Sequence, residues 1–138
     1  MRYEVALGIL TGEIKWINGP FPAGEWTDLT IFRHGLMQHI DLGERVEADD
    51  GYDAESPYVT KVPGDLLTRT PEEDALQKRV QGRHETVNAR LKRFKVLSEP
   101  FRHDVTQHGW VFRAVAVLVQ LSVKNGDPLY DVEYNVRY

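Results

Sequence analysis

The chain has 138 residues, of which 41% are hydrophobic and 28% charged, a balance typical of one soluble globular domain. It contains no cysteine, which excludes disulfides and thiolate metal sites. Its net charge of −4 differs from the basic excess of most proteins that bind DNA alone. No apolar run reaches the roughly 18–20 residues that span a bilayer, and Arg2 and Glu4 stand where a signal peptide would be apolar. We therefore expect an intracellular protein without a membrane partner.

The first third of the chain predicts a β-hairpin followed by a helix. Residues 3–10 and 14–18 are rich in β-forming residues and flank a short polar turn, which is the pattern of a hairpin. A helix is expected to begin at Thr27 or Asp28 and to end near Gly43. Its apolar positions, which recur at helical spacing, are Leu29, Phe32, Leu36 and Ile40.

The middle of the chain predicts two short strands and a long helix. Residues 45–48 and 58–62 have the composition of strands, and a turn signal follows each of them. The helix is expected to run from Thr70 to about Leu97, because Pro71 and the acids after it suit a first turn. Its predicted core-facing stripe is Leu76, Val80, His84, Val87, Leu91 and Phe94.

The last part of the chain predicts one more helix and a tail. Residues 108–123 suit a helix, although their β-branched residues also allow a strand. The tail, residues 126–138, is expected to be loosely held beside a single domain that spans residues 1–125. Helices and strands in this order favour an α/β fold with a sheet flanked by helices. The residues expected along one face of the last helix are Val111, Val115, Leu118 and Ser122.

Acidic residues at two places could carry chemistry. Asp49 and Asp50 end a predicted strand, which is where α/β sheets usually place active-site groups, and strand alternation does not decide between them. Glu85 shares one face of the long helix with Asn88 and Lys92, and that face is expected to border the core rather than open solvent, because it adjoins the apolar stripe. Carboxylates from both places could together bind a hard divalent cation. Acid-rich turns and mixed helix faces are also common on solvated surfaces, so the spacing leaves both interpretations open.

Four segments resemble the motifs of Harbinger-type DDE transposases. Gly24 to Arg33 is similar to the motif G-x-(W/V)-x-D-x-x-(I/V)-(F/L)-R, and Ala48 to Tyr52 is similar to A/G-D-x-G-Y. Arg83 to Phe94 resembles the helix that carries the family's third acid, with a lysine seven residues after it. Phe101 to Val115 resembles the family's C-terminal end. The four segments stand in the family's order and cover most of the chain.

The resemblance implies an incomplete RNase H-like fold with a mixed sheet, and a metal-dependent nuclease or transposase that acts on DNA in the nucleus of a eukaryote. By position in the motifs, Asp49 would be the second catalytic acid and Glu85 the third, and both would hold Mg²⁺ or Mn²⁺. Asp28 is the motif aspartate that is not one of the three acids, and its expected role is a helix N-cap. Asn88 belongs to the third motif and is expected to be structural.

A local basic stretch follows Glu85 on the same predicted helix. Its residues are candidates for contact with DNA phosphates, and a solvated helix face is the alternative interpretation. Lys92 is the position that the third motif singles out. The residues assigned to nucleic-acid binding are Lys92, Arg90 and Arg93.

The chain also departs from the family. The family's first acid lies in a D-G-(T/S) strand upstream of the part that matches Arg2 to Val5, where this sequence begins, and Gln81 replaces an arginine common in the family. We therefore expect a fragment without its first core strand, inactive alone, whose open sheet edge a second copy or a companion chain would cover. One alternative is a domesticated, non-catalytic remnant that binds DNA or protein. Another is an unrelated α/β module in which Asp49 and Glu85 lie far apart.

Overall fold

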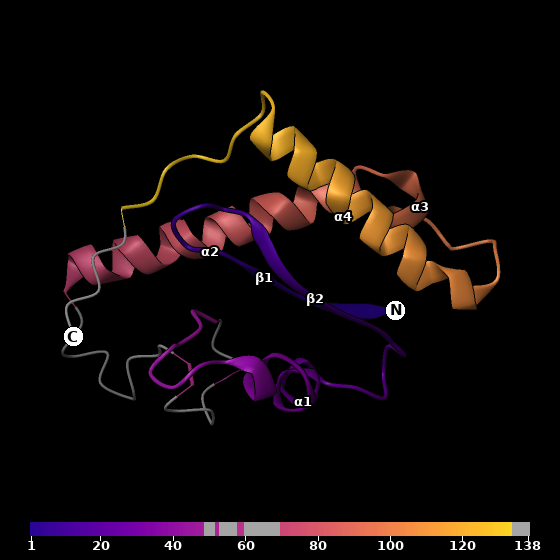
Figure 1. Ribbon diagram of the computed structural model, residues 1–138, viewed down its shortest axis with the longest axis horizontal. Coiled ribbons are helices and arrows are strands. Elements are labelled where there is room, and N and C mark those ends of the chain that lie inside the picture. Colours follow the sequence, from indigo (N-terminus) through magenta and orange to yellow (C-terminus); the bar gives the residue numbers. More distant parts are fainter. Residues whose placement is uncertain (49–51, 53–57, 60–69, 134–138) are drawn as a thin grey trace.

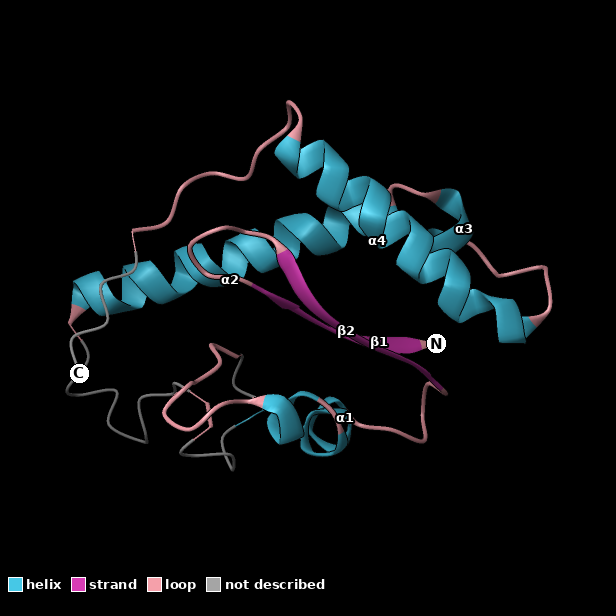
Figure 2. Cartoon of the chain, viewed as in Figure 1, coloured by secondary structure: helices cyan, strands magenta, loops and turns pink. Residues whose placement is uncertain are grey.

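The computed structural model describes residues 1–48, 52, 58–59 and 70–133. The hairpin strands lie between α1 on one side and α2 with α4 on the other (Figures 1 and 2). The chain is therefore a mixture of helices and strands, as predicted. The elements in chain order are β1 (Arg2–Leu7), β2 (Ile14–Phe21), α1 (Asp28–His34), the 3-10 helix η1 (Leu36–His39), α2 (Pro71–Lys92), α3 (Lys95–Ser98), the 3-10 helix η3 (Val105–Gln107) and α4 (His108–Lys124).

The predicted hairpin is confirmed, and among the described residues its two antiparallel strands form the whole sheet. The turn is closed by two backbone hydrogen bonds of 2.8 Å, from the Gly8 amide to the Glu13 carbonyl and from the Gly12 amide to the Gly8 carbonyl. Gly12 has a φ of 68°, a conformation that glycine adopts without strain. β2 runs beyond the predicted Asn18 to Phe21.

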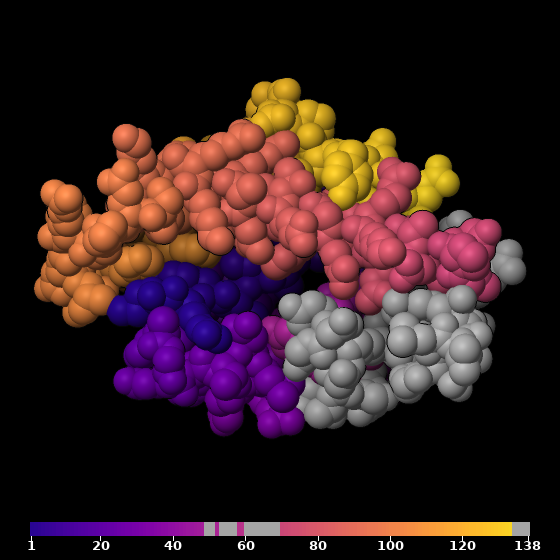
Figure 3. Space-filling view, turned by 180° about the vertical axis from the view of Figure 1, so that it is seen from behind, coloured from indigo at the N-terminus to yellow at the C-terminus, as the bar shows by residue number. Residues whose placement is uncertain are grey.

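The core lies between the hairpin and the two long helices. Seen from behind, the N-terminal residues in indigo are covered above by α2 and below by the region of α1 (Figure 3). The buried cluster consists of Val87, Leu91, Phe112, Val115, Ala116, Val119 and Leu129. The hairpin residues that pack against it are Tyr3, Val5, Leu7, Ile14 and Ile17. Because they alternate along β1, one face of the hairpin is turned to the helices.

The start of α2 was predicted correctly because its signals are local. The Thr70 hydroxyl accepts a hydrogen bond from the Glu73 amide at 3.2 Å, and the Glu73 carboxylate accepts one from the Thr70 amide at 3.1 Å. Pro71 occupies the first helical position, where its missing N–H costs nothing. The helix ends at Lys92, earlier than predicted, because the backbone of Phe94 is extended and the chain turns into α3.

The first helix is shorter than predicted because it is interrupted at Gly35. The helix α1 ends at His34, and η1 follows it. The Gly35 backbone lies against β-hairpin side chains, so that a Cβ there would stand 2.3 Å from the Asn18 side-chain nitrogen and 2.6 Å from a Glu4 carboxylate oxygen. The Leu36 amide donates to that same carboxylate at 3.2 Å. A contact with β1 therefore ends a helix that its own sequence would continue.

The last helix is confirmed, and the face predicted for its apolar residues is only partly directed to the core. Val115 is buried, whereas Leu118 is half exposed and Ser122 is exposed. The residues of α4 that are buried are Gly109, Phe112, Val115, Ala116 and Val119. Apolar residues occur on all sides of α4, so periodicity alone does not identify the side that faces the hairpin.

The segment after α4 packs along α2 instead of hanging free. Leu129 and Val132 are buried. The Tyr130 hydroxyl donates to the Arg79 carbonyl at 2.7 Å, and the Arg79 guanidinium donates to the Asp131 carbonyl at 2.8 Å. The first half of the predicted tail is thus part of the folded unit, and residues 134–138 lie outside the described part.

The two short strands predicted before α2 are reduced to one bridge within the described residues. Val46 pairs with Val59 in a parallel bridge, in which the Val46 amide donates to the Tyr58 carbonyl at 2.9 Å. Residues 60–62, the rest of the second predicted strand, lie outside the described part. The bridge leads directly into the segment that holds the predicted aspartates.

Candidate functional site

Of the two predicted catalytic acids, the structure describes Glu85 only. Asp49 and Asp50 lie outside the described residues. Glu85 is on an exposed side of α2, and its carboxylate has no hydrogen bond or ion pair among the described residues. That part of the chain also contains no group of three His, Asp or Glu side chains that could bind a metal ion. A shared site between Asp49 and Glu85 therefore stays a prediction.

The helix face that carries Glu85 also presents Lys92, which is likewise exposed. The two residues are seven positions apart, so two turns of α2 place them one above the other. This arrangement could hold a cation at the carboxylate and an anionic oxygen at the ammonium group. Both side chains lie on a rigid helix whose opposite side is fixed in the core by Val87 and Leu91.

Asn88, the third residue of that predicted face, has a structural role. The Val5 carbonyl can only accept, so His84 Nε2 carries the proton that it donates to this oxygen at 2.9 Å. Nδ1 of the same ring is then the acceptor for the Asn88 side-chain amide, 3.2 Å away. Asn88 thus orients His84, and His84 attaches α2 to the outer edge of β1.

The three predicted DNA-binding residues differ in how accessible they are. The Arg90 side chain is only 11% exposed and donates to the Asp127 carbonyl at 2.5 Å, to the Asp127 carboxylate at 3.2 Å and to the Pro128 carbonyl at 3.5 Å. These contacts hold the segment after α4 against α2. Lys92 and Arg93 are exposed and are the two of the three that an anion could reach.

The expected N-cap role of Asp28 was wrong, because Thr27 caps α1. The Thr30 amide donates to the Thr27 hydroxyl at 3.1 Å, and Asp28 is the first residue inside the helix. Its carboxylate accepts from Arg2 at 3.0 Å and joins α1 to the start of β1. Since both side chains are largely exposed, we expect this ion pair to contribute little to stability.

A buried arginine that the sequence analysis missed holds the hairpin turn against α2. Arg83 is 5% exposed, and its guanidinium donates to the Ile9 carbonyl at 2.5 Å. Its Nε is buried and has no hydrogen-bond partner. A Cβ at Gly12 would lie 2.4 Å from this guanidinium. The signal for this residue was present, because Arg83 stands three residues after Val80 and four before Val87, on the apolar stripe.

A second missed residue, Glu4, lies on the opposite face of the hairpin. One carboxylate oxygen accepts from the Trp16 indole at 2.6 Å and from the Leu36 amide at 3.2 Å. The other oxygen is buried and has no hydrogen-bond partner. Glu4 therefore connects both strands to the start of η1. Strand alternation indicated its face, since the core-facing residues Tyr3 and Val5 flank it.

Tyr3 and His108 form a hydrogen-bonded pair at the N-terminal end of α4. The Tyr3 hydroxyl lies 2.6 Å from His108 Nδ1. Burial raises the pKa of Tyr3 to about 12, against a smaller lowering by the charge of Arg113. Burial, helped by the positive N-terminus, lowers the pKa of His108. Both groups are therefore neutral near pH 7. The hydrogen bond between them links β1 to α4, and neither group is a charged nucleophile.

Among the acids of the described residues, Glu13 is the one whose pKa the fold lowers most. It forms ion pairs with Lys15 and with Lys124, the latter at 2.9 Å. Hydrogen bonds from Lys15 and then Lys124 lower the pKa of Glu13 to about 2 from its ordinary value of 4.5. The ion pairs link the hairpin turn to the end of α4.

The replacement Glu13→Gln should reduce the acid sensitivity of the fold. Because the folded state lowers the pKa, the stabilisation by Glu13 is complete above about 4.5 and is lost as the pH falls toward 2. Urea unfolding at several pH values between 2 and 6 measures this slope. Glu25→Gln, at an exposed acid without an ion pair in the described part, is the matched control. Equal slopes for the Glu13 variant and the unmodified chain would contradict the expectation.

Comparison with known proteins identifies no relative. No family model, no curated protein and no solved structure matches the chain. Within the described residues, no helix is both long and apolar enough to cross a bilayer. The RNase H-like fold and the nuclease assignment therefore rest on the sequence motifs.

Proposed function

We propose that the chain is a transposase-derived DDE nuclease domain with an incomplete RNase H-like fold, and that a polypeptide of these 138 residues does not cleave DNA alone. The observation that carries the proposal is the exposed side of α2. One unbroken helix presents Glu85 and, two turns later, Lys92, which is the arrangement of the family's third acid and its lysine. The Glu85 carboxylate has no competing partner among the described residues.

A divalent cation suits the part of this site that the structure describes. Carboxylate oxygens are the ligands that Mg²⁺ and Mn²⁺ prefer, and Glu85 offers such a group on the surface. In the proposal, Asp49 supplies the second carboxylate and the bound ion helps a water or a 3′-hydroxyl to attack a phosphodiester. Lys92 and Arg93 would hold the phosphate backbone beside it.

Inactivity follows from the number of acids. The DDE reaction uses three carboxylates, and no segment of the 138 residues matches the D-G-(T/S) strand that carries the first one. Two carboxylates can bind one cation weakly but leave the two-ion arrangement incomplete. We therefore expect metal binding without strand cleavage.

Titration with Mn²⁺, followed by electron paramagnetic resonance of the free ion, tests the site. Asp49→Asn and Glu85→Gln should each weaken binding at least tenfold, because each removes one of two charged ligands. Glu72→Gln changes an exposed acid in the first turn of the same helix and should have no effect. The assignment is wrong if Asp49→Asn and Glu85→Gln bind Mn²⁺ as the unmodified chain does.

Incubation with supercoiled plasmid and Mn²⁺ tests the proposal that the chain does not cleave DNA alone. We expect no nicking above the background of the Glu85→Gln variant. Cleavage by the unmodified chain that Glu85→Gln abolishes would contradict the expected inactivity, while it would support the assignment of the third acid.

The second candidate function is a non-catalytic binding module, and a different observation favours it. The net charge is −4, and α4 exposes a row of large apolar residues to solvent. DNA titration at increasing salt separates the possibilities. Metal-independent binding that weakens with salt would favour a DNA-binding remnant, and no binding at moderate salt would favour a protein partner.

A further inference from the structure

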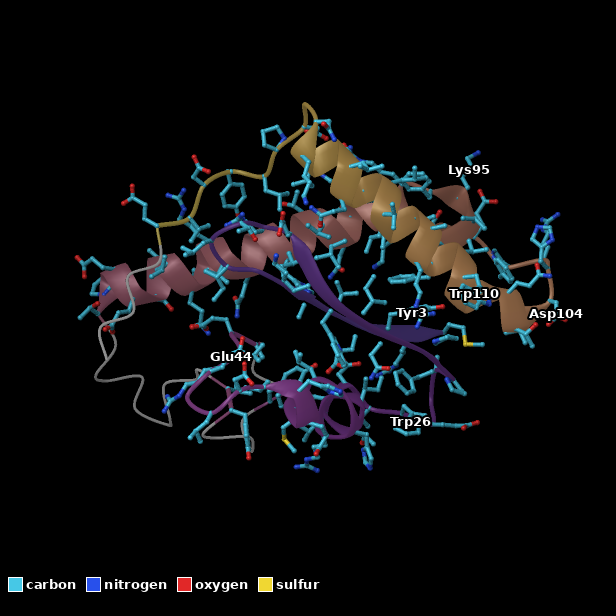
Figure 4. All side chains as sticks on the ribbon, in the orientation of Figure 1. Tyr3, Trp26, Glu44, Lys95, Asp104 and Trp110 are labelled. Atoms are coloured by element: carbon cyan, nitrogen blue, oxygen red, sulfur yellow. The ribbon has the colours of Figure 1, made fainter. Side chains whose placement is uncertain are left out.

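The helix α4 is apolar on two opposite sides. Its inner side is buried against the hairpin and α2, whereas a helix at the surface normally has a polar outer side. Figure 4 labels Trp110 in the first turn of this helix. A contiguous exposed patch of this kind usually marks an interface. The large apolar residues on the outer side, with their exposed fractions, are Trp110 (76%), Val117 (58%), Leu118 (52%) and Leu121 (50%).

The centre of this outer side has a symmetric spacing. The exposed residues Trp110, Ala114, Val117 and Leu121 follow one another at intervals of four, three and four, which is the seam of a coiled coil. The pattern reads the same from either end. If a second α4 lies antiparallel about an axis between Ala114 and Val117, Trp110 faces Leu121 of the other copy and Ala114 faces Val117. At the two ends of the seam the large Trp110 therefore packs against the medium-sized Leu121. Near its centre the small Ala114 packs against the medium-sized Val117.

We propose that two copies of this chain associate through the outer sides of α4, antiparallel and related by a two-fold axis. The interface is then isologous, because each copy contributes the same surface. The four seam residues are uncharged, and the exposed Arg113 lies beside them. Antiparallel packing also places Lys124, which pairs with Glu13 of its own copy, near the exposed Asp104 that precedes the partner's α4, so opposite charges lie close together at both ends. A parallel pair would instead place Lys124 of one copy beside Lys124 of the other.

A mostly apolar groove continues from the seam toward β2. Val117 and Leu121 line this shallow groove of about 420 Å³ between α4 and β2, together with Trp16 and Ile17. Its charged lining residues are Lys15, Arg113 and Lys124. The helix has 17 residues and is therefore about 25 Å long. A contact of that length is smaller than the roughly 800 Å² per partner of a standard interface. We therefore expect a dissociation constant of about 1–100 µM.

Sedimentation equilibrium of the whole chain from about 1 to 300 µM tests the association. The unmodified chain should change from monomer to dimer over this range, and Val117→Glu should raise the dissociation constant at least tenfold. Leu121→Gln is a milder second variant, and circular dichroism checks that both keep their helices. Leu10→Glu, at an apolar residue of the hairpin turn that is 71% exposed, should leave association unchanged. A chain that stays monomeric at about 300 µM, or a dimer that the two α4 variants leave intact, overturns the proposal.

Cysteine cross-linking tests the antiparallel orientation, because the natural chain has no cysteine. Ala114→Cys lies near the two-fold axis and should form a disulfide-linked dimer on mild oxidation. Lys124→Cys lies at the end of the helix, where antiparallel copies are more than 20 Å apart by the rise of about 1.5 Å per residue. It should therefore stay monomeric under the same conditions. Efficient cross-linking through Lys124→Cys would mean parallel packing and would contradict the proposed geometry.

Discussion

Replacement of Phe112 by alanine is expected to lower the free energy of unfolding by about 3–5 kcal/mol. Phe112 is buried at the point where α4 meets the hairpin. Its ring lies flat against that of Tyr3, with ring centroids 3.7 Å apart and an angle of 4° between the planes. Truncation therefore removes buried apolar surface and an aromatic contact at once, and it leaves a cavity that the two long helices cannot easily close.

Urea unfolding followed by circular dichroism measures this loss. Trp110→Ala is the matched control, because it removes a larger aromatic side chain that is 76% exposed on the same helix. At a concentration where the chain is monomeric, the control should change stability by about 0.5 kcal/mol or less. A loss below about 1 kcal/mol for Phe112→Ala would mean that this residue is not part of the core.

Replacement of Arg83 by methionine is expected to raise the free energy of unfolding by about 1 kcal/mol or more. A buried guanidinium costs several kcal/mol to remove from water. Arg83 regains only the hydrogen bond to the Ile9 carbonyl, and its Nε has no partner. Methionine keeps most of the packing volume and removes the charge.

The same unfolding experiment tests this expectation with two further variants. Arg83→Lys keeps a buried charge but loses the planar fork, so it should be less stable than the unmodified chain. Arg79→Met removes an exposed arginine from the same helix and should change stability by about 0.5 kcal/mol or less. Destabilisation by Arg83→Met would contradict the expectation and would mean that the hydrogen bond to the Ile9 carbonyl outweighs the cost of burying the guanidinium.

Local signals predicted the hairpin and the start of α2 correctly, and long-range contacts account for what the sequence analysis missed. The capping box at Thr70 and the hairpin turn depend on neighbouring residues, so both were readable. The interruption at Gly35 depends on the carboxylate of Glu4, which lies far away in the sequence. The sequence does not identify the core-facing side of α4, because apolar residues occur on all of its sides. The positions of the hairpin and α2 determine which side is buried.

The same distinction between local signals and long-range contacts applies to the candidate site. Spacing alone placed Glu85 and Lys92 on one face of a helix, but it suggested a face at the border of the core, and both residues are exposed. Spacing could not show that Arg90 already forms hydrogen bonds within the chain, because its partner Asp127 lies in the segment after α4. It likewise could not show that Asn88 orients His84, since that role depends on the Val5 carbonyl of β1.

The attachment of the C-terminal segment to α2 changes where the chain can be shortened. Arg79 and Arg90, about three turns apart on α2, both donate to backbone carbonyls of this segment, while Leu129 is buried between the long helices and the hairpin. A version ending at Asn125 would expose the apolar side of α2 and leave Arg90 half-buried without its carboxylate. Any trimmed version intended to fold cooperatively should therefore retain the residues through Glu133.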